Sequence, residues 1–130
     1  MKKRNTVPVL AALLFCAAAV WFSYDTREIF RGTRVRNPDR YEIVFTEMNQ
    51  TDTWSPVLSA GDTLQVRFDI PKGRADLEIG LPGKEPVYRG ADIRSGDFVL
   101  GIAEPGEYTV TVRTRHAAGE LSIRVVPEKE

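Results

Sequence analysis

The sequence predicts an all-β fold: an antiparallel, jelly-roll-like β-sandwich of seven or eight short strands, preceded by one N-terminal apolar helix. From residue 41 onward, apolar and polar residues alternate in short runs, which is the period of strands with one buried and one solvated face. Gly and Pro turn signals separate these runs about every 10–12 residues. A nearly continuous apolar stretch over residues 7–22 predicts the helix.

The clearest strand follows the Pro105-Gly106 turn signal. Its Tyr108, Val110 and Val112 fall on one face, so a slip of one residue in pairing would turn all three to water. The strictest alternation covers residues 63–70. Further strands are expected near residues 41–46, 54–58, 77–81, 87–89, 98–102 and 121–125, with turns at 71–73 and 117–119.

Residues 1–24 have two interpretations. As a signal anchor, residues 7–24 just reach the length of about 17–25 apolar residues that a membrane helix needs, and the adjacent basic residues 2–4 favour a domain outside the membrane. As a cleaved signal peptide, the segment would end at residues 17–19, all alanine. We favour the anchor, and therefore a single-pass protein of the cell membrane; the alternative is a secreted or periplasmic protein.

The remaining chain divides into a basic stalk or linker (residues 25–40), the β-sandwich domain (41–126) and a charged tail (127–130). The stalk holds five arginines, expected to be solvated or to contact anionic lipid head groups. Its Ile29, Phe30 and Val35 either dock on the domain or form a first edge strand.

Charge and composition exclude several classes of function. Residues 41–130 carry 10 basic and 15 acidic residues, whereas a nucleic-acid-binding domain needs a basic surface. The single cysteine, Cys16, lies in the apolar segment, so no disulfide is expected within the domain. His116 is the only histidine and no Gly-x-Ser-x-Gly elbow is present. We therefore predict no enzyme, no catalytic residue and no cofactor.

Three further features were weighed as sites. Aspartates 62, 76, 92 and 97 are scattered, so no calcium or other metal site is predicted, although Asp92 and Asp97 bracket one loop. The triplet at residues 49–51 fits a glycosylation acceptor. A binding surface is predicted around Trp54 and Tyr88, with Tyr41 as a third member, because exposed aromatic rings stack on sugars or anchor protein partners. Alternatively, Trp54 closes an open end of the core.

The segments Gly61-Asp62-Thr-Leu, Asp76-Leu-Glu-Ile and Pro105-Gly-Glu-Tyr occur in an order that resembles bacterial extracytoplasmic domains of the pre-peptidase C-terminal type. The last segment also resembles the emp24-type (GOLD) sandwich. The resemblance covers residues 41–126 and implies a secreted or tethered module without catalytic residues. We expect a membrane-tethered, extracytoplasmic domain with a non-enzymatic binding or structural role at the cell envelope, with an envelope protein or polysaccharide as partner. The alternative is a secreted accessory module that binds carbohydrate or cell-wall polymer after signal cleavage.

Overall fold

The computed structural model describes residues 27–128 and confirms an all-β, antiparallel fold. The strands are β1 (Ile29–Asn37), β2 (Arg40–Asn49), β3 (Thr51–Trp54), β4 (Val57–Leu58), β5 (Thr63–Gly80), β6 (Tyr88–Gly90), β7 (Ser95–Gly101), β8 (Gly106–Glu107) and β9 (Thr109–Val126). The predicted N-terminal helix, Cys16 and residues 129–130 of the charged tail lie outside the described residues. Within residues 27–128, no helix is long and apolar enough to cross a membrane.

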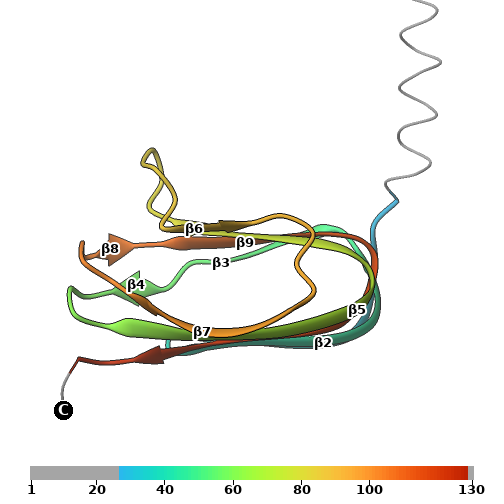
Figure 1. The fold of residues 1–130 in the computed structure, drawn as a ribbon, viewed down its shortest axis with the longest axis horizontal. Helices are drawn as coiled ribbons and strands as arrows, with labels where there is room; N and C mark the ends of the chain where they lie inside the picture. The colour runs from blue at the N-terminus through green and yellow to red at the C-terminus, as the bar shows by residue number, and fades with distance from the viewer. Residues whose placement is uncertain (1–26, 129–130) are drawn as a thin grey trace, which may run out of the picture.

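Two 18-residue strands, β5 and β9, organise the whole domain. They pair antiparallel from Thr63↔Val126 at one end to Gly80↔Thr109 at the other. Midway the pairing register shifts, and both strands bend, so that one continuous ladder folds over into two layers (Figure 1). The expected division of each of these segments into two strands joined by a turn is therefore wrong.

The signals at residues 71–73 and 117–119 mark these bends instead of chain reversals. Gly73 has a φ of 76° and Gly119 a φ of 151°. A Cβ at Gly119 would lie 2.2 Å from the backbone oxygen of Asp69 on the facing strand. Glycine is needed here because the two backbones approach so closely, and glycine gives the same sequence signal at a bulge as at a turn.

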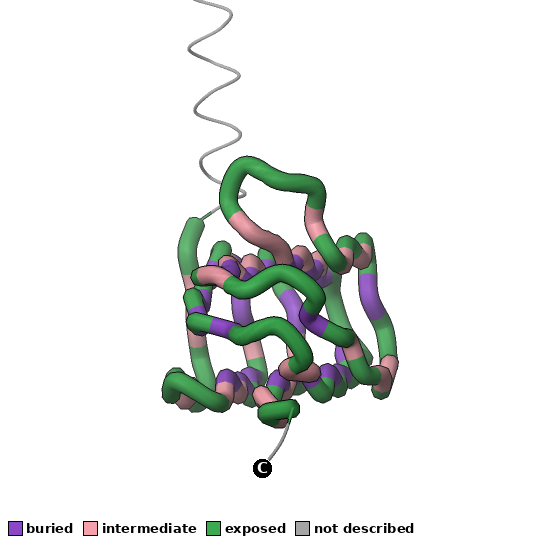
Figure 2. Tube along the Cα trace, turned by 90° about the vertical axis from the view of Figure 1, so that its left-hand side faces the viewer, coloured by how far each residue is buried: buried purple, intermediate pink, exposed green. Residues whose placement is uncertain are grey.

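The two layers meet face to face. The lower layer in Figure 1 has the order β1, β2, the second half of β9, the first half of β5, and β7. The upper layer has the order β3, the first half of β9, the second half of β5, and β6. The short β4–β8 ladder lies beside them. Seen from the end, buried and exposed residues alternate along the strands of both layers (Figure 2).

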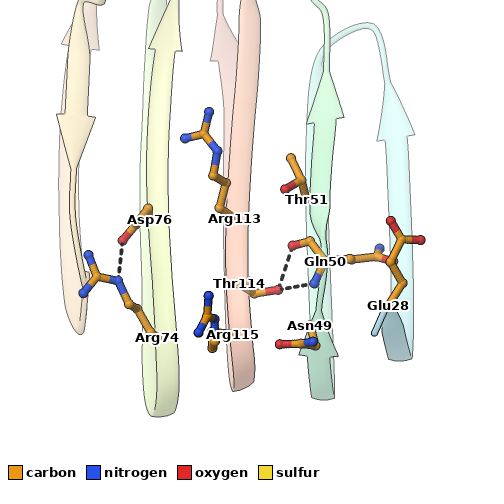
Figure 3. Close-up of a pocket in the computed structure, with 9 residues that line it drawn as sticks. All are labelled: Glu28, Asn49, Gln50, Thr51, Arg74, Asp76, Arg113, Thr114 and Arg115. Carbon is orange, nitrogen blue, oxygen red and sulfur yellow. Dashed lines mark hydrogen bonds and ion pairs between the residues drawn. The ribbon is translucent and has the colours of Figure 1, made fainter. Parts of the chain in front are cut away.

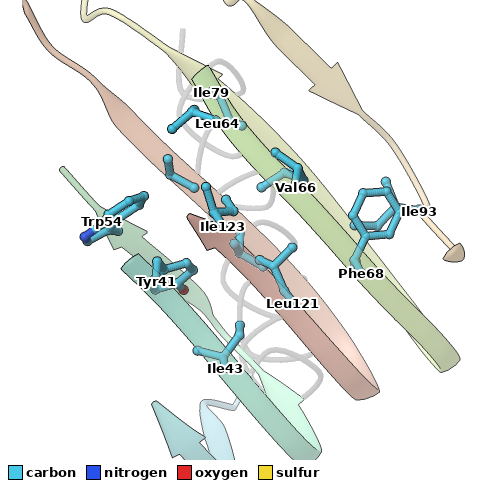
Figure 4. Close-up of a cluster of buried hydrophobic side chains, with 14 of the residues drawn as sticks. Tyr41, Ile43, Trp54, Leu64, Val66, Phe68, Ile79, Ile93, Leu121 and Ile123 are labelled. Carbon is cyan, nitrogen blue, oxygen red and sulfur yellow. The ribbon is translucent and has the colours of Figure 1, made fainter. Parts of the chain in front are cut away.

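The hydrophobic core fills the space between the layers. As predicted, Tyr108, Val110 and Val112 all face inward, each with no more than 2% of its surface exposed. Leu64, Val66, Phe68 and Ile70, which alternate along the first half of β5, face them from the other layer. Figure 4 shows the first three of these side chains within the core. Burying one such aliphatic side chain stabilises the fold by about 1.5–3 kcal/mol.

Most of the expected stalk is part of the sheet. Residues 29–37 form edge strand β1, which pairs with β2 through the turn at residues 38–39. This was the second of the two interpretations for Ile29, Phe30 and Val35. The pairing sets Arg34 opposite Ile43 and Arg36 opposite Tyr41. Both arginines therefore lie on the inner face of the sheet at its edge, where their side chains, 26% and 42% exposed, reach Asp52 instead of extending into the linker.

Candidate functional site

The predicted aromatic surface is divided between two edges of the sandwich. Trp54, Val110, Ile79 and Tyr88 lie opposite one another in a row across the four strands of the upper layer. Three strand spacings, about 14 Å, separate Trp54 from Tyr88. Both side chains point inward, so they do not form one surface.

Each of these two rings instead closes one edge of the core. Trp54 is 6% exposed and stacks on Tyr41 of the lower layer at a centroid distance of 5.5 Å (Figure 4). Its indole Nε1 donates a hydrogen bond to the carbonyl oxygen of Asn37 at 2.9 Å. Tyr88 is half-buried against Phe98 at 4.9 Å. Every Phe, Tyr and Trp between residues 27 and 128 is buried or half-buried, so the described domain offers no fully exposed ring for stacking on a sugar.

A buried ionic cluster lies beside Trp54, and sequence reasoning missed it. The Asp52 cluster consists of Asp52 from β3, Tyr41 from β2, and Arg34 and Arg36 from β1. The Asp52 carboxylate, 7% exposed, accepts hydrogen bonds from the Tyr41 hydroxyl and from Arg36 Nη2. Arg34 Nε lies 3.5 Å from the same carboxylate. Burial, and then the hydrogen bond to Asp52, raise the pKa of Tyr41 well above its ordinary value, so Tyr41 remains a donor.

The site with the clearest binding chemistry is a groove of about 600 Å³ on the outer face of the upper layer (Figure 3). We call it the arginine groove. The ladder places Thr51, Arg113 and Asp76 opposite one another, and Arg115 opposite Arg74. The complete lining is Glu28, Asn49, Gln50, Thr51, Arg74, Asp76, Arg113, Thr114 and Arg115.

Hydrogen-bond donors dominate the arginine groove. Arg74 Nε lies 3.2 Å from Asp76 Oδ1, and that oxygen also accepts the backbone N–H of Asp92 at 2.7 Å. Arg113 is more loosely paired, with Nη1 3.9 Å from Glu78. Arg115 is exposed, and no other residue of the described chain forms a hydrogen bond or ion pair with its guanidinium. The groove therefore presents two weakly engaged or free guanidinium groups on alternate residues of β9.

The floor of the groove is fixed by polar contacts between β9 and Gln50, the residue before β3. Thr114 Oγ1 donates to the carbonyl oxygen of Gln50 at 2.9 Å and accepts the N–H of Gln50 at 3.1 Å (Figure 3). These bonds hold the strands that carry Thr51 and Arg113 in register. A rigid strand pair that displays arginines forms a preorganised site for an anion, because the planar guanidinium binds carboxylate and phosphate oxygens in pairs.

The sequence contained a partial signal for this groove. Arg113 alternates with Tyr108, Val110 and Val112 along the sequence, so it falls on the opposite face of the strand, and Arg115, two residues later, shares that face. Arg74 and Thr51 lie beside these arginines only because of strand pairing, which a local sequence pattern does not reveal.

The four aspartates weighed as calcium ligands have separate partners. Asp62 accepts the N–H of Ser59 at 2.8 Å, and Asp97 pairs with Arg67 at 3.2 Å. Asp76 and Asp92 are adjacent: the Asp76 carboxylate accepts the backbone N–H of Asp92, and each carboxylate also pairs with an arginine. In residues 27–128, no three His, Cys, Asp or Glu side chains are grouped so as to hold a metal ion.

His116 and Asn49 support the bend of β9. His116 adopts a φ of 46°, and its ring Nδ1 lies 3.6 Å from Glu47. Its backbone N–H donates to Asn49 Oδ1 at 3.0 Å, and Asn49 Nδ2 donates to the carbonyl oxygen of Arg27 at 2.7 Å. Asn49 is only 4% exposed, so its amide is inaccessible as a glycosylation acceptor in the folded domain.

Among known proteins, the chain has a distant structural likeness and no match at the level of a family. No family model matches the chain, and no curated protein matches it. Among solved structures, the chain is similar to the crystal structure of PliG from Aeromonas hydrophila, a periplasmic lysozyme inhibitor of g-type lysozyme. The two share 15% identity over 74% of this chain and 87% of that chain, with a TM-score of 0.46. A likeness at this level carries no argument about function.

Proposed function

We propose that the protein is a membrane-tethered, extracytoplasmic β-sandwich with a non-enzymatic binding role at the cell envelope, and that it binds an anionic group of its partner in the arginine groove. The observation that carries this proposal is the groove itself, in which Arg113 and Arg115 point outward from a rigid strand with little or no engagement by other described residues. The tether and its orientation are supported by the apolar and basic pattern of residues 1–24.

The chemistry of the groove favours binding over catalysis. The guanidinium groups that line it are hydrogen-bond donors without an acceptor site, so they do not serve as general bases. The carboxylate of Asp76, which also lines the groove, is already paired with Arg74 and accepts the backbone N–H of Asp92. A nucleophile paired with a base, which acyl-transfer chemistry requires, is not found among the lining residues.

The placement of the aromatic rings weighs against the carbohydrate alternative. A sugar-binding module of the expected kind would present rings on its surface, whereas Trp54 and Tyr88 both face the core. The resemblance to pre-peptidase C-terminal and emp24-type domains stays a prediction, because its motifs lie in turns and core positions that the sandwich itself requires.

Photocrosslinking in intact cells tests the binding role without assuming the class of partner. A photoreactive phenylalanine at Thr53, exposed on β3 beside the groove, should crosslink to an envelope component. The adduct should disappear when Arg113 and Arg115 are both changed to Gln. The same probe at Val99, 62% exposed on the lower layer, is the matched control. Equal adducts with and without the two arginines would refute the proposal.

Tethering is tested separately by the mass of the mature protein and by protease accessibility. An intact N-terminus and a domain that is digested from outside the cytoplasmic membrane are expected. Loss of residues 1–19 would favour the secreted alternative. If the domain stays protected although the protease reaches the outer side of the cytoplasmic membrane, the domain lies on the inner side and the proposed orientation is wrong.

A further inference from the structure

The arginine groove lies at the end of the domain where the chain connects to the N-terminal apolar segment. Glu28, only four residues after Tyr24, lines the groove. The described chain begins at the end of the sandwich where β5 and β9 bend, and the last described residues lie at the opposite end (Figure 1). Four residues span at most about 14 Å. If the segment ending at Tyr24 is held in a bilayer, the groove lies within that distance of the membrane surface.

The charges of the domain are suited to this placement. Residues 27–128 carry 14 basic and 16 acidic residues, a net charge of −2. An anionic membrane therefore repels the domain as a whole, and a docked orientation needs a local positive surface. The groove supplies one, with three arginines against Glu28 and an Asp76 already engaged by Arg74.

Two of the arginines that sequence alone assigned to the stalk cannot perform this task. Arg36 donates to the buried Asp52 carboxylate, and Arg34 Nε lies 3.5 Å from it. Arg113 and Arg115 are instead available on the outer surface of the same end of the domain. Arg113 and Arg115, more than 70 residues further along the chain, are therefore better placed to contact a membrane than these two arginines of the expected linker.

We infer that the arginine groove docks the domain on the membrane that anchors it, by binding the phosphate groups of anionic phospholipids to Arg113 and Arg115. This inference rests on the proposed tether and names the partner of the proposed groove. Docking would hold the outer face of the upper layer against the bilayer and turn the outer face of the lower layer toward the surroundings (Figure 1).

The test uses the full chain in nanodiscs. In a Cys16→Ala background, a fluorophore is attached at Thr53→Cys, and lipids that carry a headgroup spin label serve as quenchers. Discs of neutral phosphatidylcholine are compared with discs that contain anionic phosphatidylglycerol. Strong quenching is expected only in the anionic discs, because arginines near an anionic surface each strengthen binding about fivefold. A fluorophore at Val99→Cys should be quenched weakly in both.

Variants and salt separate docking from simple proximity. Arg113→Gln with Arg115→Gln should abolish the extra quenching, whereas Lys at both positions should retain much of it. Raising the salt from low to high concentration should have the effect of the Gln variant, because ions screen charges on the scale of the Debye length, about 8 Å at physiological ionic strength. Quenching that is equal in the two lipids, unchanged by the Gln variant or absent throughout overturns the inference.

Two outcomes distinguish this inference from the proposal on which it rests. A chain that does not enter the discs refutes the tether. A chain that enters the discs without lipid-dependent quenching, and that still gives the Arg-dependent crosslink to a protein in cells, refutes lipid docking while the binding role stands.

Discussion

Asp52→Asn keeps the size of a buried side chain and removes its charge. In the folded domain this carboxylate is 7% exposed and has three partners: the Tyr41 hydroxyl, Arg36 Nη2 and Arg34 Nε. Tyr41 and Arg36 donate to different oxygens, and an amide keeps only one oxygen, so one of these two hydrogen bonds survives. The charge that neutralised two inward-pointing arginines is lost.

The expected cost follows from the exposure of the arginines. Removing one partner of a fully buried ion pair typically costs about 3–5 kcal/mol, since the remaining charge is left without compensation. Here the side chains of Arg34 and Arg36 are 26% and 42% exposed, so water replaces part of the lost interaction. We therefore expect the free energy of unfolding to fall by about 2–4 kcal/mol.

Urea unfolding followed by far-ultraviolet circular dichroism measures this change on residues 25–130, which contain every core residue of the described domain. The matched control is Asp97→Asn, which breaks an Arg–Asp pair of the same type whose side chains are 72% and 69% exposed. That variant should lose no more than about 0.5–1 kcal/mol. If the two substitutions cost the same, the buried cluster does not stabilise the edge of the sandwich and the reasoning fails.

Three further predictions concern stability. Burial and a carboxylate partner raise the pKa of Tyr41 above its ordinary 10.0. Its phenol therefore ionises first in the unfolded chain, and the free energy of unfolding should fall above about pH 10 by up to about 1.4 kcal/mol per pH unit; Tyr41→Phe should flatten this fall in urea titrations. Tyr108→Ala should cost about 3–5 kcal/mol and Glu107→Ala almost nothing; equal melting shifts would contradict the predicted register. Gly119→Ala should prevent or strongly destabilise folding, because its Cβ would overlap the facing backbone, whereas Gly101→Ala, with open space around it, should melt like the parent.

The period of two predicted most of the strands, and the register of β9 followed from it. Tyr108, Val110 and Val112 are core residues because an alternating run places all its apolar side chains on one face, and burying that face stabilises the fold. The same pattern did not reveal that β5 and β9 are continuous. Gly73 and Gly119 lie where the backbones of two strands come into close contact. A glycine in the sequence indicates a close backbone approach and a chain-reversing turn equally well, so the sequence alone does not distinguish them.

The positions of the aromatic rings and of the two charged sites depend on strand pairing, which the sequence pattern does not contain. The residue types of Trp54 and Tyr88 alone suggest exposed rings. Strand pairing places both residues in one row with Val110 and Ile79, and this row faces the core. The Asp52 cluster needs residues from three strands, and the arginine groove needs β5 and β9 to lie side by side. Such sites depend on tertiary register, so local composition gave only the alternation of Arg113 and Arg115.

The continuity of β5 and β9 has a consequence for how the domain opens. Because each long strand contributes to both layers, unfolding of one layer leaves the strands at the centre of the other layer continuous with unfolded chain. Partial unfolding of one sheet, which is open to sandwiches whose sheets share no strand, is therefore costly. Amide exchange in the two layers should report one common opening free energy, and a protease should find the loop at residues 81–87 long before either sheet. After that loop is cut, the two sheets resist further digestion together and, once opened, are degraded together.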